Sequence, residues 1–294
     1  MAEYVLFTDS TADLTAELVA ELGVQVLPMS FNLNGSDYKN YPDNRELAPH
    51  DFYDALRAGG VSTTSQINQV AFTEAFEPVL ASGRDVLYLA FSSGLSGTCH
   101  SAVLAAEELR EKYPGRTVEV IDTLQASMGE GLAVYYAASL KNEGKPLAEV
   151  ADWFKANKMR VCAWFTVDDL MFLKRGGRLS GAAAVAGTLL GIKPVLHVDD
   201  EGHLVAMEKV RGRKASLDGL VKHFENSDVP PAEQVVFVSH GDCPADCQYV
   251  ADKIRAMGVK RVCLGDIGPV IGAHSGPGTV ALFFFANTDG SMSE

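Results

Sequence analysis

Short apolar runs alternate with segments of helical periodicity along the first half of the chain. Residues 4–8 and 85–91 have the length and the side chains of buried strands, whereas Phe72, Phe76 and Leu80 recur at helical spacing. Strands that alternate with helices of about 10–15 residues indicate a parallel sheet covered by helices on both faces. The pattern predicts further strands at residues 24–27, 30–33 and 118–121, and helices from residue 14 and at 51–58, 71–81, 96–111, 128–141 and 147–156.

The second half is also of α/β character, but it contains a hairpin signal. Residues 193–198 and 204–210 are apolar runs, and Gly202 between them can supply the positive φ of a hairpin loop. We therefore predict two α/β domains, residues 1–158 and 159–294, the first built mainly on a parallel sheet with flanking helices. Other predicted elements of the second half are strands at 160–165, 235–239, 259–264 and 279–285, and helices at 217–224 and 246–257.

Composition narrows the class of protein. The 294 residues suffice for two packed domains, and the 47% of apolar residues can fill a core and line an apolar ligand cavity. The formal net charge of −13 repels phosphate backbones and anionic membrane surfaces, so binding to nucleic acid or to such membranes is disfavoured.

Two uncharged stretches do not predict membrane spans. Residues 179–192 are too few, and residues 267–288 are interrupted by glycines and prolines that would leave backbone groups unsatisfied in lipid. The N-terminal residues lack the pattern of a signal peptide, and the odd count of 5 cysteines favours reduced thiols. We expect a soluble, cytoplasmic protein without stable membrane insertion.

Hydroxyl side chains gather at two predicted helix starts. Thr63, Thr64 and Ser65 precede the helix predicted from residue 71, and Ser93 and Ser96 lie in a strand-to-helix loop. Such loops of a parallel sheet are a common place for ligands. The alternative is that these hydroxyls cap the helices, which does not exclude ligand binding.

His274 stands out among the histidines because it lies between Gly272 and Gly276, in a segment that we read as a turn before the last strand. Glycines allow the backbone to approach a ligand closely, and the histidine could donate to a carboxylate. A histidine in a surface turn is the alternative.

Two basic groups contrast with the acidic composition, and they contain Arg175, Arg178, Arg211 and Arg213. They are either a solvated face or a docking surface for a partner. His240, Cys243 and Cys247 do not have the spacing of a zinc site, so no metal site is predicted. The sequence also lacks a P-loop, an H-E-x-x-H motif and a nucleophile elbow.

Seven segments together resemble the DegV family of bacterial lipid-binding proteins. They extend from residue 9 to residue 278, in the order expected, and therefore cover nearly the whole chain. The chain departs from the family pattern after Gln66, where Ile67-Asn68 replace Pro-Ser. The seven segments are residues 9–14, 63–66, 92–98, 125–129, 173–180, 191–194 and 272–278.

The resemblance implies a fold of two α/β domains with one long-chain fatty acid held between them. It implies that the chain is not an enzyme by itself but presents the fatty acid carboxylate to the catalytic subunit of a fatty acid kinase, which forms an acyl phosphate for phospholipid synthesis. A buried carboxylate needs hydrogen-bond donors. In this reading the carboxylate-binding residues are Thr63, Thr64, Ser65, Ser93, Ser96 and His274, the docking residues are Arg175, Arg178, Arg211 and Arg213, and no cofactor is required.

Two other functions remain to be weighed against this one. In a serine hydrolase of acyl esters, Ser93 or Ser96 would be the nucleophile and His274 the base, although the nucleophile elbow is missing. A sugar or phosphate enzyme on a related fold would need a phosphate loop or metal ligands that the sequence lacks. The preferred acyl length and unsaturation cannot be read from the sequence.

Overall fold

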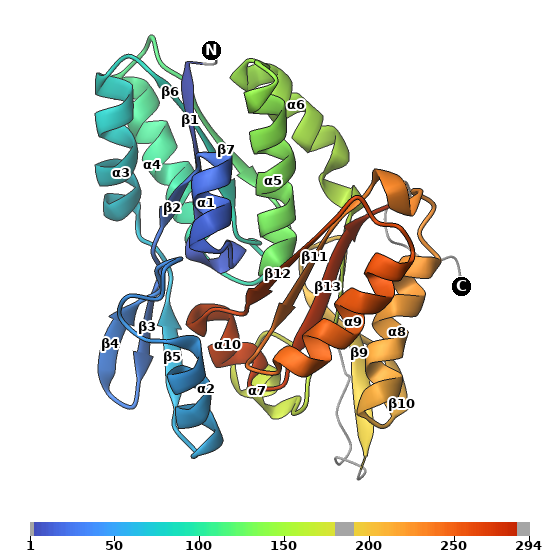
Figure 1. The fold of residues 1–294 in the computed structure, drawn as a ribbon. Coiled ribbons are helices and arrows are strands. Elements are labelled where there is room, and N and C mark those ends of the chain that lie inside the picture. Colours follow the sequence, from blue (N-terminus) through green and yellow to red (C-terminus); the bar gives the residue numbers. More distant parts are fainter. Residues whose placement is uncertain (1–2, 180–190, 287–294) are drawn as a thin grey trace.

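The computed structural model describes residues 3–179 and 191–286. Two sheets dominate these residues, and helices lie between and outside them (Figure 1). Ser180, the last residue of one family segment, and residues 180–190 of the uncharged stretch lie outside the described residues.

The first sheet is entirely parallel, as predicted, with the strand order β2-β1-β6-β7. Its strands are β1 (Tyr4–Asp9), β2 (Gln25–Leu27), β6 (Asp85–Ala90) and β7 (Val118–Asp122). Helices α3 (Gln69–Ala81) and α4 (Thr98–Lys112) pack on one face, and α1 (Ala16–Leu22), α5 (Met128–Asn142) and α6 (Leu147–Asn157) pack on the other. Short connections between apolar strands and amphipathic helices produce this arrangement.

The second sheet is mixed, with the order β10-β9-β8-β13-β11-β12. β9 and β10 form the predicted antiparallel hairpin, and Gly202 in its loop has a φ of 77°. α8 (Arg213–Glu225) and α9 (Pro244–Ala256) cover its outer face. The strands are β8 (Val161–Thr166), β9 (Ile192–Val198), β10 (Leu204–Arg211), β11 (Val235–His240), β12 (Arg261–Asp266) and β13 (Val280–Phe285).

Helix α5 lies between the two sheets (Figure 1). Its residues Leu132 and Val134 share one apolar cluster with Leu87 of the first sheet and with Phe165 and Phe237 of the second. The two halves are therefore joined by a common core. The division into domains at residues 158 and 159 remains a prediction.

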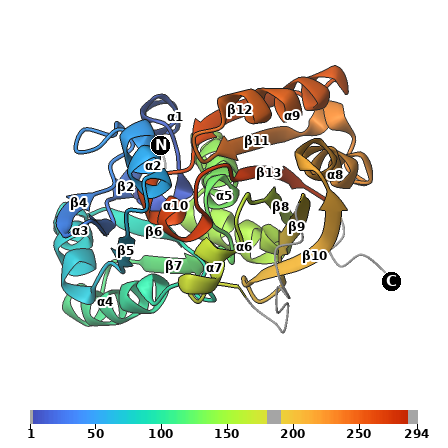
Figure 2. The ribbon, with the colours of Figure 1, turned by 90° about the horizontal axis from the view of Figure 1, so that it is seen from below.

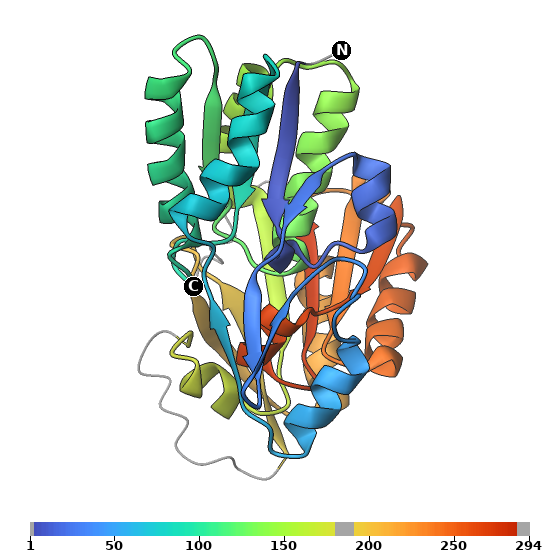
Figure 3. The ribbon, with the colours of Figure 1, turned by 90° about the vertical axis from the view of Figure 1, so that its left-hand side faces the viewer.

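A small antiparallel sheet, which the sequence analysis missed, lies below the parallel sheet (Figure 3). It consists of β4 (Ser36–Lys39), β3 (Ser30–Leu33) and β5 (Ser62–Ser65), and α2 (Pro49–Arg57) packs against it through Phe52 and Phe31. Two short helices, α7 (Met171–Arg175) and α10 (Pro269–Ser275), lie between this small sheet and the second large sheet (Figure 2). They bring residues far apart in sequence to one place.

Candidate functional site

A cavity of about 440 Å³ lies between the two halves. Alternate residues of two neighbouring strands form one wall, since Ala163 pairs with Phe283 and Phe165 pairs with Ala281. Phe91, after β6, also lines the cavity. This part of the cavity is apolar, and its volume is typical of sites that enclose a small molecule.

One end of the cavity is polar. Thr64 of β5, Ser96 of the loop before α4, Arg178 beyond α7 and His274 of α10 all line it. The Thr64 Oγ1 atom lies 2.8 Å from His274 Nε2. Segments from both halves of the chain therefore converge on this end.

His274 lies in the last turn of α10, so its prediction in a glycine-rich turn was wrong. Pro269 begins this helix and overrides the turn propensity of the glycines. The idea that these glycines admit a ligand is also wrong, because Gly272 and Gly276 contact the rings of Tyr53 and Phe172. The missing side chains make room for aromatic packing.

The hydrogen-bond partners of His274 identify its tautomer. Burial, followed by the charge of Arg178, lowers the pKa of His274 to about 4, so the ring is neutral near pH 7. Its Nδ1 atom is buried against Gly176 and has no hydrogen-bond partner. A buried N–H without an acceptor is costly, so the proton lies on Nε2 and is donated to Thr64 Oγ1. The Thr64 hydroxyl is then free to donate into the cavity.

The other predicted hydroxyls differ in position. Ser65 and Ser96 line the cavity, whereas Ser93 is exposed and does not. Thr63 is exposed and lines a neighbouring outer pocket of about 320 Å³. Strand alternation explains why Thr63 and Thr64 face different ways.

The capping alternative holds for one segment only. Ser96 Oγ accepts the N–H of Thr98, the first residue of α4, so Ser96 has a capping contact and also lines the cavity. Helix α3 is capped by Asn68 rather than by Thr63–Ser65, which form a strand. Asn68 also explains how this helix starts without the family proline.

The four arginines assigned to docking have different environments. Arg178 lines the cavity, and its Nε atom donates to Leu95 O at 3.1 Å. Arg213 is half-buried and donates to Asp246 and Gly278 O. Arg175 and Arg211 are exposed. The sequence analysis did not predict that Arg178 lines the cavity, because a run of basic residues does not show which side chain points inward.

Asp9 and Glu130 form a second polar cluster, which is completely buried behind the cavity wall. Thr11 Oγ1 contacts both carboxyls, and Thr8 Oγ1 contacts both Leu89 O and Glu130 Oε1, at 3.0 and 2.6 Å. Two hydroxyl protons cannot serve four acceptors, so protons on the carboxyl groups must supply the remaining contacts. Burial raises the pKa of Asp9, and burial followed by the charge of Asp9 raises the pKa of Glu130 well above its usual range, so Glu130 is a protonated member of the network.

Asp13 belongs to the same buried region and contacts the cavity wall. Its carboxyl accepts from Ser127 Oγ at 2.6 Å and from Gly268 N at 2.9 Å, and Ser127 lines the cavity. Burial raises the pKa of Asp13 to about 8. Here too every carboxyl oxygen has a partner.

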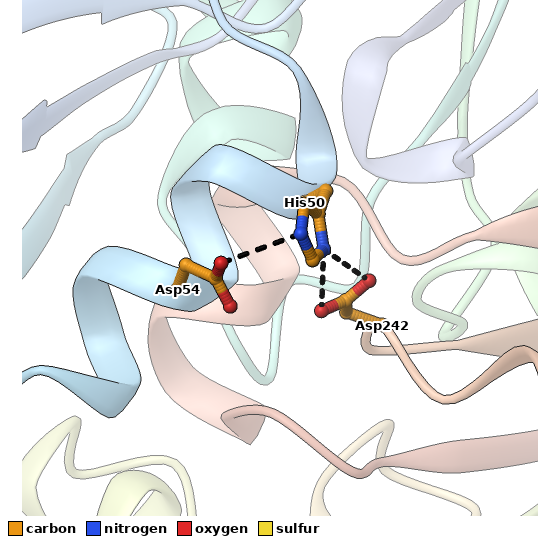
Figure 4. Close-up of side chains that lie close together, drawn as sticks. All are labelled: His50, Asp54 and Asp242. Carbon is orange, nitrogen blue, oxygen red and sulfur yellow. Dashed lines mark hydrogen bonds and ion pairs between the residues drawn. The ribbon is translucent and has the colours of Figure 1, made fainter.

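His50, Asp54 and Asp242 form a cluster that resembles a metal site (Figure 4). His50 Nδ1 lies 3.1 Å from Asp242, and Nε2 lies 3.3 Å from Asp54, so the two ring nitrogens face different carboxylates. Arg57 also pairs with both aspartates. A cationic ring between two carboxylates accounts for this geometry, and the cluster is an ion-pair network that joins α2 to the loop after β11.

Among residues 3–179 and 191–286, no helix has the length and hydropathy needed to cross a membrane.

Comparison with known proteins gives a consistent result. Residues 4–287 match the profile of a family described as "Uncharacterised protein, DegV family". A DegV domain-containing protein of Clostridium perfringens is 46% identical over 289 residues, which cover 98% of this chain and 99% of that protein.

Solved structures are similar over nearly the whole chain. A DegV family protein from Thermus thermophilus, described by its fatty acid binding, has 34% identity and a TM-score of 0.87, with 97% of this chain and 99% of that chain covered. DegV of Bacillus subtilis, described as a fatty acid binding protein, has 27% identity and a TM-score of 0.83, with 98% and 100% covered.

Proposed function

The chain belongs to the DegV family, and we propose that it binds one long-chain fatty acid in the cavity between its two halves. The observation that carries this proposal is the form of the cavity, an apolar body that ends in hydroxyl groups and one arginine. An acyl chain gains about 0.8 kcal/mol for each methylene removed from water. The relatives described as fatty acid binding proteins support the same ligand.

The fatty acid carboxylate would lie at the polar end. Thr64 would donate one hydrogen bond, because His274 occupies its acceptor side, and the guanidinium of Arg178 would supply the positive charge. Ser96, another of the predicted residues, also lines the cavity, and it lies at the start of α4. His274 would act through Thr64 rather than by contacting the carboxylate.

We also propose that a separate kinase subunit phosphorylates the bound carboxylate, in the cytoplasm, as a step toward phospholipid synthesis. The sequence has no recognised nucleotide-binding motif, so ATP must come from a partner. Arg175 and Arg211 are the exposed arginines of the predicted docking set. The outer pocket that contains Arg175 shares Thr64 and His274 with the cavity, which supports a docking role for this arginine near the proposed carboxylate.

The serine hydrolase alternative receives no support from the site. His274 hydrogen-bonds Thr64, and Ser96 Oγ contacts Thr98 Oγ1 at 2.9 Å, so no nucleophile and base are paired. An acyl-ester turnover assay would detect this activity.

The decisive experiment is mass spectrometry of lipid extracted from denatured protein that was produced in lipid-replete cells. We expect about one long-chain fatty acid per chain. Protein that carries no such lipid, and that fails to take up added oleic acid, would contradict the proposal.

Docking is tested separately, with the cognate kinase subunit. Arg211→Glu should slow formation of the acyl phosphate at low salt and leave fatty acid occupancy unchanged. Arg255→Glu on α9 is the matched control, since Arg255 is also surface-exposed and pairs with Asp252 of its own helix. Equal rates for the two variants would remove Arg211 from the docking surface.

A further inference from the structure

Ser275 carries a buried hydroxyl that the proposed carboxylate site does not use. It is the last residue of α10, directly after His274, and it lines the cavity. Only 5% of its surface is exposed, and its Oγ atom has no hydrogen-bond partner among the described residues. A buried hydroxyl without a partner is uncommon and costs free energy, so this one requires a physical reason.

Other helical serines show what Ser275 could have done. Serine in a helix usually donates its hydroxyl to a carbonyl three or four residues earlier. Ser139 donates to Tyr135 O at 2.8 Å, and Ser216 donates to Arg213 O at 2.8 Å. Ser275 makes no such bond to its own helix, so its hydroxyl remains available on the cavity side.

Two other hydroxyl groups that line the cavity have hydrogen-bond partners, in contrast to Ser275. Ser127 also lines the cavity, but its Oγ atom contacts Asp13 at 2.6 Å and Ser239 at 3.1 Å. Thr279 lines it too, and its hydroxyl contacts the carbonyls of Ser275 and Gly276. Ser275 therefore differs from these two residues: its hydroxyl is unpartnered, and it comes from the same short helix as His274.

We infer that Ser275 Oγ is a further ligand-binding group, which donates a hydrogen bond to the acidic head group of the lipid. This inference rests on the proposed function. A carboxylate has two oxygens and about four acceptor positions, more than the Thr64 hydroxyl alone can fill. Thr64 and Ser96 each already accept one hydrogen bond, from His274 Nε2–H and from the Thr98 N–H, which leaves the Thr64 proton free to donate to the ligand. With Ser275 and Arg178, the polar end is rich in donors and suits a head group that only accepts.

If the inference is right, Ser275→Ala should weaken oleic acid binding without lowering the stability of the lipid-free protein. Dissociation constants for oleic acid should be roughly ten- to hundredfold higher than for the wild type, the range for a lost hydrogen bond to a charged group. The urea midpoint of the lipid-free variant should be equal to or above that of the lipid-free wild type, because an unpartnered hydroxyl has been removed. A purely structural serine would lower the midpoint.

Two further variants sharpen the test. Ser275→Thr keeps the hydroxyl and should keep affinity within a fewfold of the wild type. Ser127→Ala removes a hydroxyl from the same cavity that is already bonded, so it should lower the lipid-free midpoint by leaving Asp13 Oδ2 without its donor.

The outcomes separate this inference from the proposed function. Wild-type protein that binds no oleic acid would contradict both. Wild-type binding with Ser275→Ala within twofold of it would overturn only the role of Ser275. A lower affinity that accompanies a lower lipid-free midpoint in Ser275→Ala would likewise assign Ser275 to structure.

Discussion

Two polar regions adjoin the cavity, and they differ in how completely their buried polar atoms are paired. The head-group region consists of Thr64, Arg178, His274 and Ser275, and it contains two buried atoms without partners, His274 Nδ1 and Ser275 Oγ. The carboxyl region consists of Asp9, Asp13 and Glu130, and the six carboxyl oxygens all accept or share hydrogen bonds.

The comparison separates structural polarity from ligand-binding polarity. A network that is complete without a ligand stabilises the fold and restricts its conformation. An unpaired buried donor such as the Ser275 hydroxyl gains most when an accepting ligand arrives, because binding then removes a penalty as well as forming a bond. Variants in the first region should therefore change stability, and variants in the second should change affinity.

The largest effect should come from Glu130. Glu130→Ala removes one of the two partners of each of the Thr8 and Thr11 hydroxyls and opens a void, so the free energy of unfolding should fall by about 3 kcal/mol or more. Glu130→Gln resembles the protonated acid and should stay much closer to the wild type near pH 7. Chemical denaturation measures both, and equal losses in the two variants would show that Glu130 is ionised in the fold.

Thr64→Ala should act on affinity instead. The loss of one hydrogen bond to a charged group should weaken oleic acid binding roughly ten- to hundredfold, and a smaller fall in the unfolding midpoint should accompany it because His274 Nε2–H loses its acceptor. Thr63→Ala is the matched control, since Thr63 is the exposed neighbour on the same strand. Wild-type affinity in Thr64→Ala, measured by titration calorimetry, would remove Thr64 from the head-group site.

The pH dependence should reveal the carboxyl region. Burial raises the pKa of Asp13 to about 8, so near pH 7 the folded state holds a proton that the unfolded state has released. The free energy of unfolding should therefore fall as pH rises from 7 toward 8, by at most about 1.4 kcal/mol per pH unit for this group. Asp13→Asn should flatten the curve, and Asn also tolerates the αL backbone at this position, where φ is 49°. An unchanged slope in Asp13→Asn would mean that Asp13 is ionised when folded.

The smallest effect should come from His50, whose cluster belongs to neither region. Its hydrogen bond to Asp242 raises the pKa of His50, so the contact stabilises the fold below pH 6.5 and is lost as pH rises through the higher folded value. His50→Gln should lower the urea midpoint slightly at pH 6 and leave it unchanged at pH 8.5. A loss of the same size at both values would show that the charge of His50 is irrelevant.

The large elements of the fold follow from patterns that the chain displays locally. Residues 85–91 and 193–210 have apolar runs and turn residues that specify a buried strand and a hairpin, and both predictions are confirmed. The small sheet was missed because Ser36–Lys39 and Ser62–Ser65 are polar strands. Their strand conformation comes from pairing with β3 across distant sequence, which no local pattern records.

The site was harder to predict for the same reason. Hydroxyl groups could be found by residue type, but only the fold distinguishes Thr64 from Thr63 and Ser96 from Ser93. Ser275 had no signal in the sequence, since its significance lies in a hydrogen bond that it does not make. The role of His274 through Thr64 likewise depends on contacts between β5 and α10.

Helix α5 has a consequence for the way the chain unfolds. It is buried along much of its length, and its apolar cluster includes residues of both large sheets. Neither half can expose its side of this helix without losing core contacts, so melting of one half should destabilise the other. We expect a single cooperative calorimetric transition for the intact chain, and a fragment of residues 1–158 should aggregate because it would expose the surface that the second sheet covers.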